Sequence, residues 1–476
     1  MGDRVDVVNV GLAEFSAYLH QRGIPCRDVD WKPPGQGDPE LADILFRLTV
    51  GFRDGRGDSL IDKANRIAFE RILSARPILR RVRPARELLP QMGEDTLLHA
   101  GPAVSWADMC GPMRGALIGA LRYEGRADSE AEAAALIESG RVRCRPTHRY
   151  GVVAPMVGVV SPSMPLFEVE NAAHGNAAYA PINEGVGHVL RFGANNAAVI
   201  QRLRWLEKSL APALDRAIAK TGGIELKRIM AQALLMGDEM HQRNAAAGLA
   251  FHKEIATAIL DCCDGMEGLS EAVSFLTRDN EQFFLNLAMA ASKSAMDPAH
   301  NIPNCSLVTA MSRNGVDFGL TVSGLGDTWV TAPSLLPRGL YFPGFSEKDA
   351  NPDMGDSAII ECYGLGGFAM AAALTVARFL GAGSLEEALD FTLDMEHICF
   401  GSNPDFSIPN LDFGGAPTGI DVIRVVATGI LPVINSGVAH REAGIGQVGA
   451  GLATPPMEAM NKALRLFHEK MVRDNG

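Results

Sequence analysis

The apolar residues between residues 198 and 298 recur at helical spacing, and this block limits the possible folds most strongly. Its segments are 198–220, 224–262 and 267–298, with breaks at Gly222-Gly223 and between Cys262 and Gly268. The segments on both sides carry β-branched runs punctuated by glycine and proline, which favour strands and turns. We therefore predict a multidomain fold of mixed α/β and α+β type, with a helical block in the middle.

The first residues predict a small Rossmann-like β-α-β unit. A short apolar run from Asp6 to Gly11 is followed by helical spacing from Leu12 to Arg22 and by a second strand-like run from Cys26 to Trp31. No G-x-G-x-x-G sequence follows the first strand, so the dinucleotide fingerprint is missing. No cofactor is therefore predicted.

The length of 476 residues suggests about three domains at roughly 150 residues each. We predict a small α/β domain over 1–95 and a mixed, then mainly helical domain over 96–300. An α+β domain with a hairpin and glycine-rich helix starts is predicted over 301–476. Asn314-Gly315 between two β-prone runs predicts that hairpin.

Charge and composition exclude several classes of partner. The 56 acidic residues outnumber the 44 basic ones, and the net charge of -12 argues against nucleic acid as a partner. No apolar run approaches the ~18 residues of a membrane span, and no secretory signal is seen at the N-terminus, so a cytoplasmic location is expected. The eight cysteines form no C-x-x-C pair, so neither disulfides nor a metal site are predicted.

A first group of candidate site residues lies between residues 170 and 176, at the end of a predicted strand. Glu170, His174 and Asn176 could orient a polar substrate and transfer a proton. The alternative is a turn in which these side chains cap backbone groups.

A second group lies between residues 237 and 244, inside a helical pattern. Asp238, His241 and Asn244 are spaced by three, which would place them on one helix face. That face could hold a substrate amide, or the three side chains could form a buried polar network between helices.

A third group could bind anions. Gly366 and Gly367 stand at the start of a predicted apolar helix, where free N–H groups and the helix dipole suit a phosphate or carboxylate. Arg114, Arg313 and Arg441 stand near glycines, and a guanidinium group suits the same anions. Each arginine could instead form a surface ion pair.

Taken together, these segments resemble the YlbE-like family. The matching motifs are spread over nearly the whole chain: Asn9-Val-Gly11, Asp30-Trp31-Lys-Pro-Pro34, His99-Ala-Gly-Pro102, Cys110-Gly-Pro-Met-Arg-Gly115, Glu170-Asn-x-x-His-Gly-Asn176, Met236-Gly-Asp-Glu-Met-His-Gln-Arg-Asn244, Arg313-Asn-Gly315, Gly324-Leu-Gly-Asp327 and Ile434-Asn-Ser-Gly-Val-Ala-His-Arg441. The resemblance implies a subunit associated with oxamate carbamoyltransferase of allantoin and purine breakdown, acting with an FdrA-type protein related to acyl-CoA synthetases.

The implied reaction converts oxalurate and phosphate reversibly to oxamate and carbamoyl phosphate. It requires sites for a small anionic substrate and for phosphate, with donors for the charge on the carbonyl oxygen. The residues expected to move protons or bind the ureido group are His174, His241, Asn176 and Glu170. Those expected to bind the substrate anions are Arg114, Arg313, Asn314, Arg441, Gly366, Gly367 and Asn244.

Two other functions agree with the same sequence. The chain could be a non-catalytic binding subunit of a complex resembling acyl-CoA synthetases, because it carries no standard catalytic signature. It could also be a hydrolase that opens amides or rings of nitrogen-rich compounds. A homo-oligomer is expected for an enzyme of this size.

Overall fold

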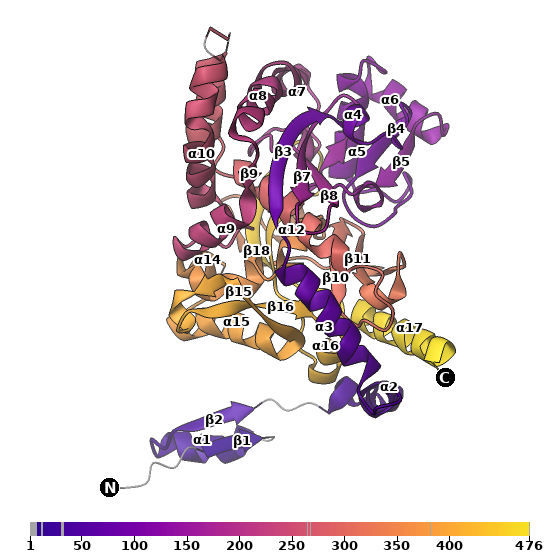
Figure 1. Ribbon diagram of the computed structural model, residues 1–476, viewed down its shortest axis with the longest axis vertical. Coiled ribbons are helices and arrows are strands. Elements are labelled where there is room, and N and C mark those ends of the chain that lie inside the picture. Colours follow the sequence, from indigo (N-terminus) through magenta and orange to yellow (C-terminus); the bar gives the residue numbers. More distant parts are fainter. Residues whose placement is uncertain are drawn as a thin grey trace.

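The computed structural model describes residues 7–10, 13–29, 33–263, 265–266, 268–380 and 382–475. Gly11 of the first expected turn and Asp30-Trp31 of the second expected strand lie outside the described residues. The described residues form helices and several small sheets (Figure 1), which confirms the predicted mixed fold.

The N-terminal β-α-β unit is present. Strands β1 (Val7–Val10) and β2 (Cys26–Val29) are parallel, and helix α1 (Ala13–Gln21) connects them. The unit stands apart from the larger body in Figure 1. Helices α2 (Pro39–Val50) and α3 (Leu60–Leu73) belong to that body, where α2 packs against the last helix, α17 (Met457–Asn475).

Helix α12 (Phe283–Met296) forms the centre of the molecule, and all of its residues are buried. It packs against a four-stranded antiparallel sheet of order β8-β7-β3-β9. The bounds of these strands are β3 (Pro77–Pro84), β7 (Pro165–Asn171), β8 (Ala177–Pro181) and β9 (Ile224–Glu225). A helix that is apolar on nearly every side can only be stable when it is enclosed in this way.

A second sheet has the order β5-β4-β6, with bounds β4 (Thr96–His99), β5 (Arg143–Pro146) and β6 (Val159–Val160). Strand β7, which begins at Pro165, does not join the sheet of the segment before it. A turn closed by the Met164 N–H and the Ser161 carbonyl redirects the chain, so β7 joins the sheet on α12 instead.

The predicted hairpin is confirmed. Strands β10 (Val308–Asn314) and β11 (Asp317–Val322) are antiparallel, and Gly315 in their turn has a φ of 84°. The sheet continues to β12 (Trp329–Pro333) on one side and to β14 (Met354–Gly355) on the other.

The remaining elements complete the helical block and the C-terminal part. Their bounds are α4 (Ala85–Leu88), α5 (Gly111–Tyr123), α6 (Glu130–Glu138), α7 (Ala197–Trp205), α8 (Ala211–Thr221), α9 (Leu226–Leu235), α10 (Ala245–Cys263), α11 (Leu269–Ser274), α13 (Ile359–Cys362), α14 (Leu374–Phe379), α15 (Leu385–Ile398), α16 (Val422–Thr428), β13 (Arg338–Tyr341), β15 (Cys399–Ile408), β16 (Gly414–Ile420), β17 (Ile434–Ala439) and β18 (Gln447–Ala453). The predicted domain boundaries near residues 95 and 300 remain a prediction.

Two predicted helices are wrong, for the same reason. Residues 236–244 form a loop between α9 and α10, because Gly237 and Met240 have φ values of 91° and 75°. The expected apolar helix after Gly364 is a 3₁₀ turn over Gly366–Ala372 followed by the short α14, and Gly366 has a φ of 61°. A left-handed residue cannot continue a right-handed helix.

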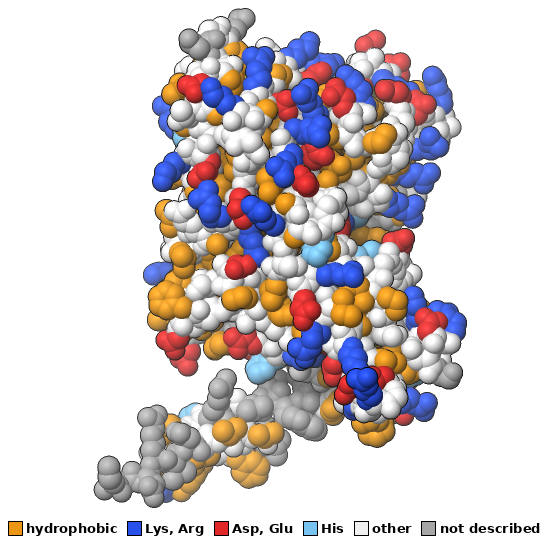
Figure 2. Space-filling view, viewed as in Figure 1, with side chains coloured by type: hydrophobic (Ala, Val, Ile, Leu, Met, Phe, Trp, Pro, Cys, Tyr) orange, Lys and Arg blue, Asp and Glu red, His pale blue; other side chains and the backbone are white. Residues whose placement is uncertain are grey.

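Figure 2 shows Lys and Arg side chains interspersed with Asp and Glu on the face that is drawn. Among the described residues, no helix has both the length and the apolar character needed to cross a membrane.

Candidate functional site

The loop between α9 and α10 is organised by the buried carboxylate of Glu239. One of its oxygens accepts hydrogen bonds from the Gln242 and Arg243 N–H groups at 2.6 and 2.8 Å. The other accepts from the His241 N–H at 3.0 Å and from Asn435 Nδ2 at 3.1 Å. Burial raises the pKa of Glu239. These bonds fix the position of His241 although the loop is not helical.

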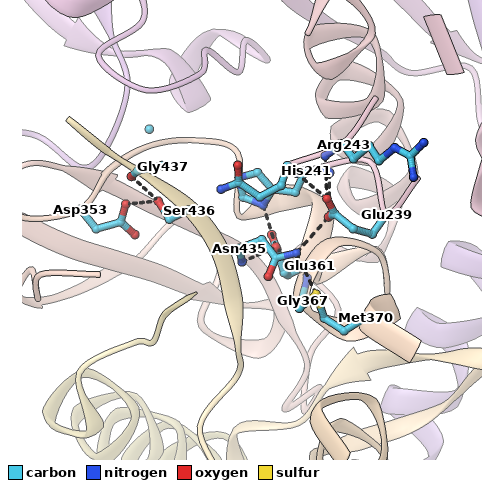
Figure 3. Close-up of polar contacts among 12 residues, drawn as sticks. Glu239, His241, Arg243, Asp353, Glu361, Gly367, Met370, Asn435, Ser436 and Gly437 are labelled. Atoms are coloured by element: carbon cyan, nitrogen blue, oxygen red, sulfur yellow. Dashed lines mark hydrogen bonds and ion pairs between the residues drawn. The ribbon is translucent and has the colours of Figure 1, made fainter. Parts of the chain in front are cut away.

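His241 forms a carboxylate–imidazole pair with Glu361, which comes from the short helix α13. The distance from His241 Nδ1 to Glu361 Oε1 is 2.7 Å, and both side chains are buried. The same oxygen accepts the N–H groups of Gly367 and Asn435, both at 3.1 Å. Figure 3 shows Glu239, His241, Glu361 and Asn435 converging. Because Nδ1 is held by Glu361, Nε2 is the ring nitrogen that remains for a ligand.

The glycines expected to bind an anion are adjacent to this pair, but their N–H groups are already used. Gly366 donates to the Glu239 carbonyl at 2.7 Å, and Gly367 donates to the carboxylate of Glu361. A side chain at Gly366 would collide with that carboxylate. The glycine turn therefore binds an anion of the protein itself and positions Glu361.

Arg313 is likewise occupied. Its guanidinium is fully buried and binds both carboxylate oxygens of Asp353, at 2.7 and 3.3 Å, and the Gly355 carbonyl at 2.9 Å. Asp353 also accepts a hydrogen bond of 2.6 Å from Ser436 Oγ. Since Asn435 and Ser436 are successive residues of β17, they project to opposite sides of it, one to Glu361 and the other to Asp353 (Figure 3). Arg313 thus positions Asp353 and Ser436 rather than offering a free cation.

A pocket of about 360 Å³ opens beside His241 and Ser436. Its other polar lining side chains are Arg191, Gln242, Gln282, Ser357 and Gln447. The backbone next to the pocket is strained, because Val157 adopts a φ of 55° that β-branched residues rarely take. Strain of this kind is concentrated at functional sites.

Arg191 supplies the positive charge of this pocket. Only 4% of the residue is exposed; its Nη2 donates to Gln282 Oε1 at 3.0 Å and its Nε to the Gly185 carbonyl at 2.9 Å. Burial lowers the pKa of Arg191 to about 10, so it is protonated at neutral pH. Burial raises the pKa of nearby Glu184 to about 7, although the Leu190 N–H and Arg191 oppose this. Near neutral pH, Glu184 therefore compensates only part of the charge of Arg191.

Sequence reasoning missed Arg191, Glu184 and Glu361. A signal was present for Arg191, which stands between apolar residues in Val189-Leu-Arg-Phe-Gly193, because an arginine within an apolar run is a candidate for a buried charge. No comparable signal marked Glu361, since its role depends on contacts with residues far away in the sequence.

The group at residues 170–176 lies elsewhere, at the end of β7 and in the turn that leads to β8, and none of these residues lines the pocket. Glu170 pairs with Arg80, with 2.5 Å between Oε2 and Nε. His174 is exposed, with Ser74 Oγ at 3.1 Å from its Nε2, and Asn176 donates to the Ser294 carbonyl at 2.9 Å. These contacts favour the alternative of a capped turn.

The remaining expected residues do not line the pocket either. Arg114 lies over the ring of Trp106 at 5.5 Å, and Arg441 is an exposed residue whose N–H donates to the Asp349 carbonyl. Asn314 holds the hairpin turn through the Val316 N–H. Asn244 is buried behind His241 and bonds its carbonyl at 3.5 Å.

The described residues include no group of three or more His, Cys, Asp or Glu side chains that could hold a metal ion. The polar side chains that line the pocket are an imidazole, a guanidinium, amides and hydroxyls. Together they could bind a small anion that carries an amide and could transfer one proton.

Comparison with known proteins shows the family of the chain. A profile of the family described as oxamate carbamoyltransferase subunit AllG matches residues 142–357. The oxamate carbamoyltransferase subunit AllG of Escherichia coli (strain K12) is 47% identical over 413 residues, covering 86% of this chain and 98% of that protein. The uncharacterized protein YahG of the same organism is 42% identical over 460 residues, covering 97% and 96%.

A solved structure is also similar. It is the crystal structure of a conserved protein of unknown function from Enterococcus faecalis V583, with 43% sequence identity and a TM-score of 0.84. The match covers 86% of this chain and 98% of the other. The range that the family profile matches, residues 142–357, contains Arg191, His241, Arg313 and Asp353. Glu361, Asn435 and Ser436 lie beyond the end of that range.

Proposed function

Because the chain belongs to the family of the oxamate carbamoyltransferase subunit AllG, we propose that it binds the small amide-bearing acid in a carbamoyl-transfer reaction. Its resemblance to a subunit of that enzyme is confirmed, whereas the label YlbE-like remains an expectation. A subunit of a multi-protein enzyme works with another protein, and our proposal for that partner is the FdrA-type protein.

The proposed reaction transfers the carbamoyl group of carbamoyl phosphate to oxamate. The amide nitrogen of oxamate attacks the carbamoyl carbon, so that a C–N bond forms and the bond from carbon to the phosphate oxygen breaks. Phosphate leaves with the electron pair, the nitrogen loses a proton, and the product is oxalurate. The site must therefore hold a carboxylate and accept a proton.

One observation carries this proposal: the 360 Å³ pocket is lined both by His241, which Glu361 orients, and by the buried cation Arg191. The guanidinium of Arg191 suits the substrate carboxylate, and the free nitrogen of His241 suits the amide proton. Gln242, Gln282 and Gln447 can donate to carbonyl oxygens and accept from amide N–H groups. The compact pocket suits a substrate no larger than a short acid amide.

The test combines the purified chain and its FdrA-type partner with oxamate and carbamoyl phosphate, and measures oxalurate and phosphate together. We expect both products in equal amounts. Arg191→Gln should reduce kcat/KM for oxamate by about 10- to 100-fold, because a charge-assisted hydrogen bond is lost. Arg114→Gln, which changes an arginine outside the pocket, is the matched control and should keep the rate.

The same experiment separates the alternatives. If oxalurate forms at the normal rate with His241→Gln, the chain is a binding subunit and the proton transfer occurs in its partner. If oxygen from labelled water enters the product without any need for phosphate, the chain is a hydrolase. If the chain and its FdrA-type partner together form no oxalurate from oxamate and carbamoyl phosphate, the carbamoyl-transfer proposal is wrong.

A further inference from the structure

A second polar pocket, of about 970 Å³, lies on a different part of the molecule. It is formed by the 3₁₀ turn Thr147–Tyr150, the C-terminal part of α12 and the sheet of β10, β11 and β12. Its lining includes His148, Arg149, Lys293, His300, Thr309 and Trp329, none of which lines the pocket at His241. Nothing in the proposed carbamoyl transfer uses these residues.

A buried negative charge lies directly behind this pocket. Asp356 is fully buried and accepts hydrogen bonds from the Gly101 N–H, the Ala154 N–H and Thr147 Oγ1, at 2.8, 2.9 and 2.6 Å. Burial alone would raise its pKa, but the nearby His148 and hydrogen bonds from Ser312 and Thr147 lower it to about 2. Asp356 is therefore ionised at neutral pH.

His148 connects this carboxylate to the pocket. Its Nε2 lies 3.5 Å from Asp356 Oδ1 and, among the described residues, makes no hydrogen bond, while only 4% of the side chain is exposed. Its ring packs edge-on against Trp329, with 5.0 Å between the centroids. Because Nε2 faces the carboxylate of Asp356, Nδ1 is the ring nitrogen that remains for a ligand in the pocket.

Asp297 and Asp327 line the pocket together with the cations, but among the described residues Arg149 has no carboxylate partner. Lys293 pairs with Asp297, and His300 pairs with Asp327, whose side chain is 94% exposed. The guanidinium of Arg149 is exposed and pairs with no carboxylate in the described part of the chain. A ligand that neutralises Arg149 must be an anion.

We propose that this second pocket binds a small oxyanion, a carboxylate or phosphate group, between Arg149 and His148, with the ring of Trp329 covering the organic part of the ligand. The hydroxyl of Thr309, which His300 holds at 3.1 Å, provides a further polar contact on the floor of the pocket. This site is separate from the one proposed for oxamate, and it does not depend on carbamoyl transfer.

The test uses Trp329 as a reporter. The chain has four tryptophans, so 5-fluorotryptophan labelling yields few fluorine NMR signals, and Trp329→Phe identifies the relevant one. Inorganic phosphate and oxamate are titrated separately at constant ionic strength up to about 20 mM, above the ~1 mM Kd of a weak ligand site. We expect the Trp329 signal to shift and saturate with at least one of them. Saturation with phosphate alone or oxamate alone identifies the preferred group.

Two variants make the test specific. Arg149→Ala should weaken the response about tenfold or more, because it removes a charge-assisted contact without changing a buried residue. Arg145→Ala, in the same exposed segment but outside the pocket, should leave the titration unchanged, and so should His241→Gln. The proposal is overturned if neither anion moves the Trp329 signal, or if Arg149→Ala responds like the unchanged protein.

Discussion

Replacement of Glu361 by glutamine tests the central geometry of the candidate site. Glutamine has nearly the same size, but it cannot stabilise the imidazolium that forms when His241 accepts a proton. The lost contact is a buried charge-assisted hydrogen bond of 2.7 Å, and such bonds contribute about 1.5–3 kcal/mol. This energy corresponds to a decrease in kcat of about 10- to 150-fold.

The change also affects stability. The Oε1 atom of Glu361 accepts three hydrogen bonds, from His241, Gly367 and Asn435. An amide oxygen can accept the same bonds more weakly, so we expect the free energy of unfolding to fall by about 1–3 kcal/mol. Chemical denaturation measures this loss, and oxalurate formation with the partner protein measures kcat.

Asp421→Asn is the matched control. Asp421 is also a buried carboxylate, and burial raises its pKa to about 6. It accepts a hydrogen bond from the Ile423 N–H at the start of helix α16 and does not line the pocket. Because Asp421 lies outside the pocket, Asp421→Asn should leave kcat unchanged. The reasoning about Glu361 is refuted if Glu361→Gln keeps the normal kcat, or if Asp421→Asn loses as much activity.

Three further predictions follow from the same structure. Arg313→Ala should lower the free energy of unfolding by about 3–5 kcal/mol in chemical denaturation because it leaves Asp353 as an unpaired buried charge, and a loss no larger than that of Arg114→Ala would contradict this. Glu184 has a pKa raised from 4.5 to about 7 in the folded protein, so its contribution to stability is fully present at low pH and declines as pH rises from 4.5 to 7. Relative to Glu184→Gln, the unchanged protein should therefore lose about 3 kcal/mol of stability between pH 4 and pH 8, and parallel pH profiles would refute the shift. Gly366→Ala should reduce both stability and activity, because the added methyl group would collide with the carboxylate of Glu361. The control is Gly125→Ala: Gly125 has a similar positive φ but open space around it, so this change should cost only about 1 kcal/mol of backbone strain. Equal effects of the two changes would show that the contact between residue 366 and Glu361 does not matter.

Several elements could be predicted from local sequence. The parallel β-α-β opening follows from a change of apolar period, and the hairpin follows from Asn314-Gly315, which favours a tight turn between strands. The start of helix α16 has a similarly local cause, because the side chain of Asp421 accepts a hydrogen bond from the Ile423 N–H. In each case the physical cause lies within a few residues of the element.

The predicted roles of the site residues were less complete. His241 lines the pocket, but the sequence placed it on a helix face, whereas residues 236–244 form a loop. Arg313 was expected to offer a free guanidinium, and the structure pairs it with Asp353. The sequence cannot show whether a cation is free, because its partner is forty residues away and meets it only after folding.

The sequence by itself determined the mixed fold, the acidic net charge and the supply of polar residues near glycines. Only the tertiary structure decided which of these residues meet. Glu361 and Asn435 come from separate elements to hold His241, and Arg191 reaches the same pocket from a third. The reason is physical: local sequence sets backbone conformation over one or two turns, whereas a buried charge is stable only where long-range packing brings it a partner.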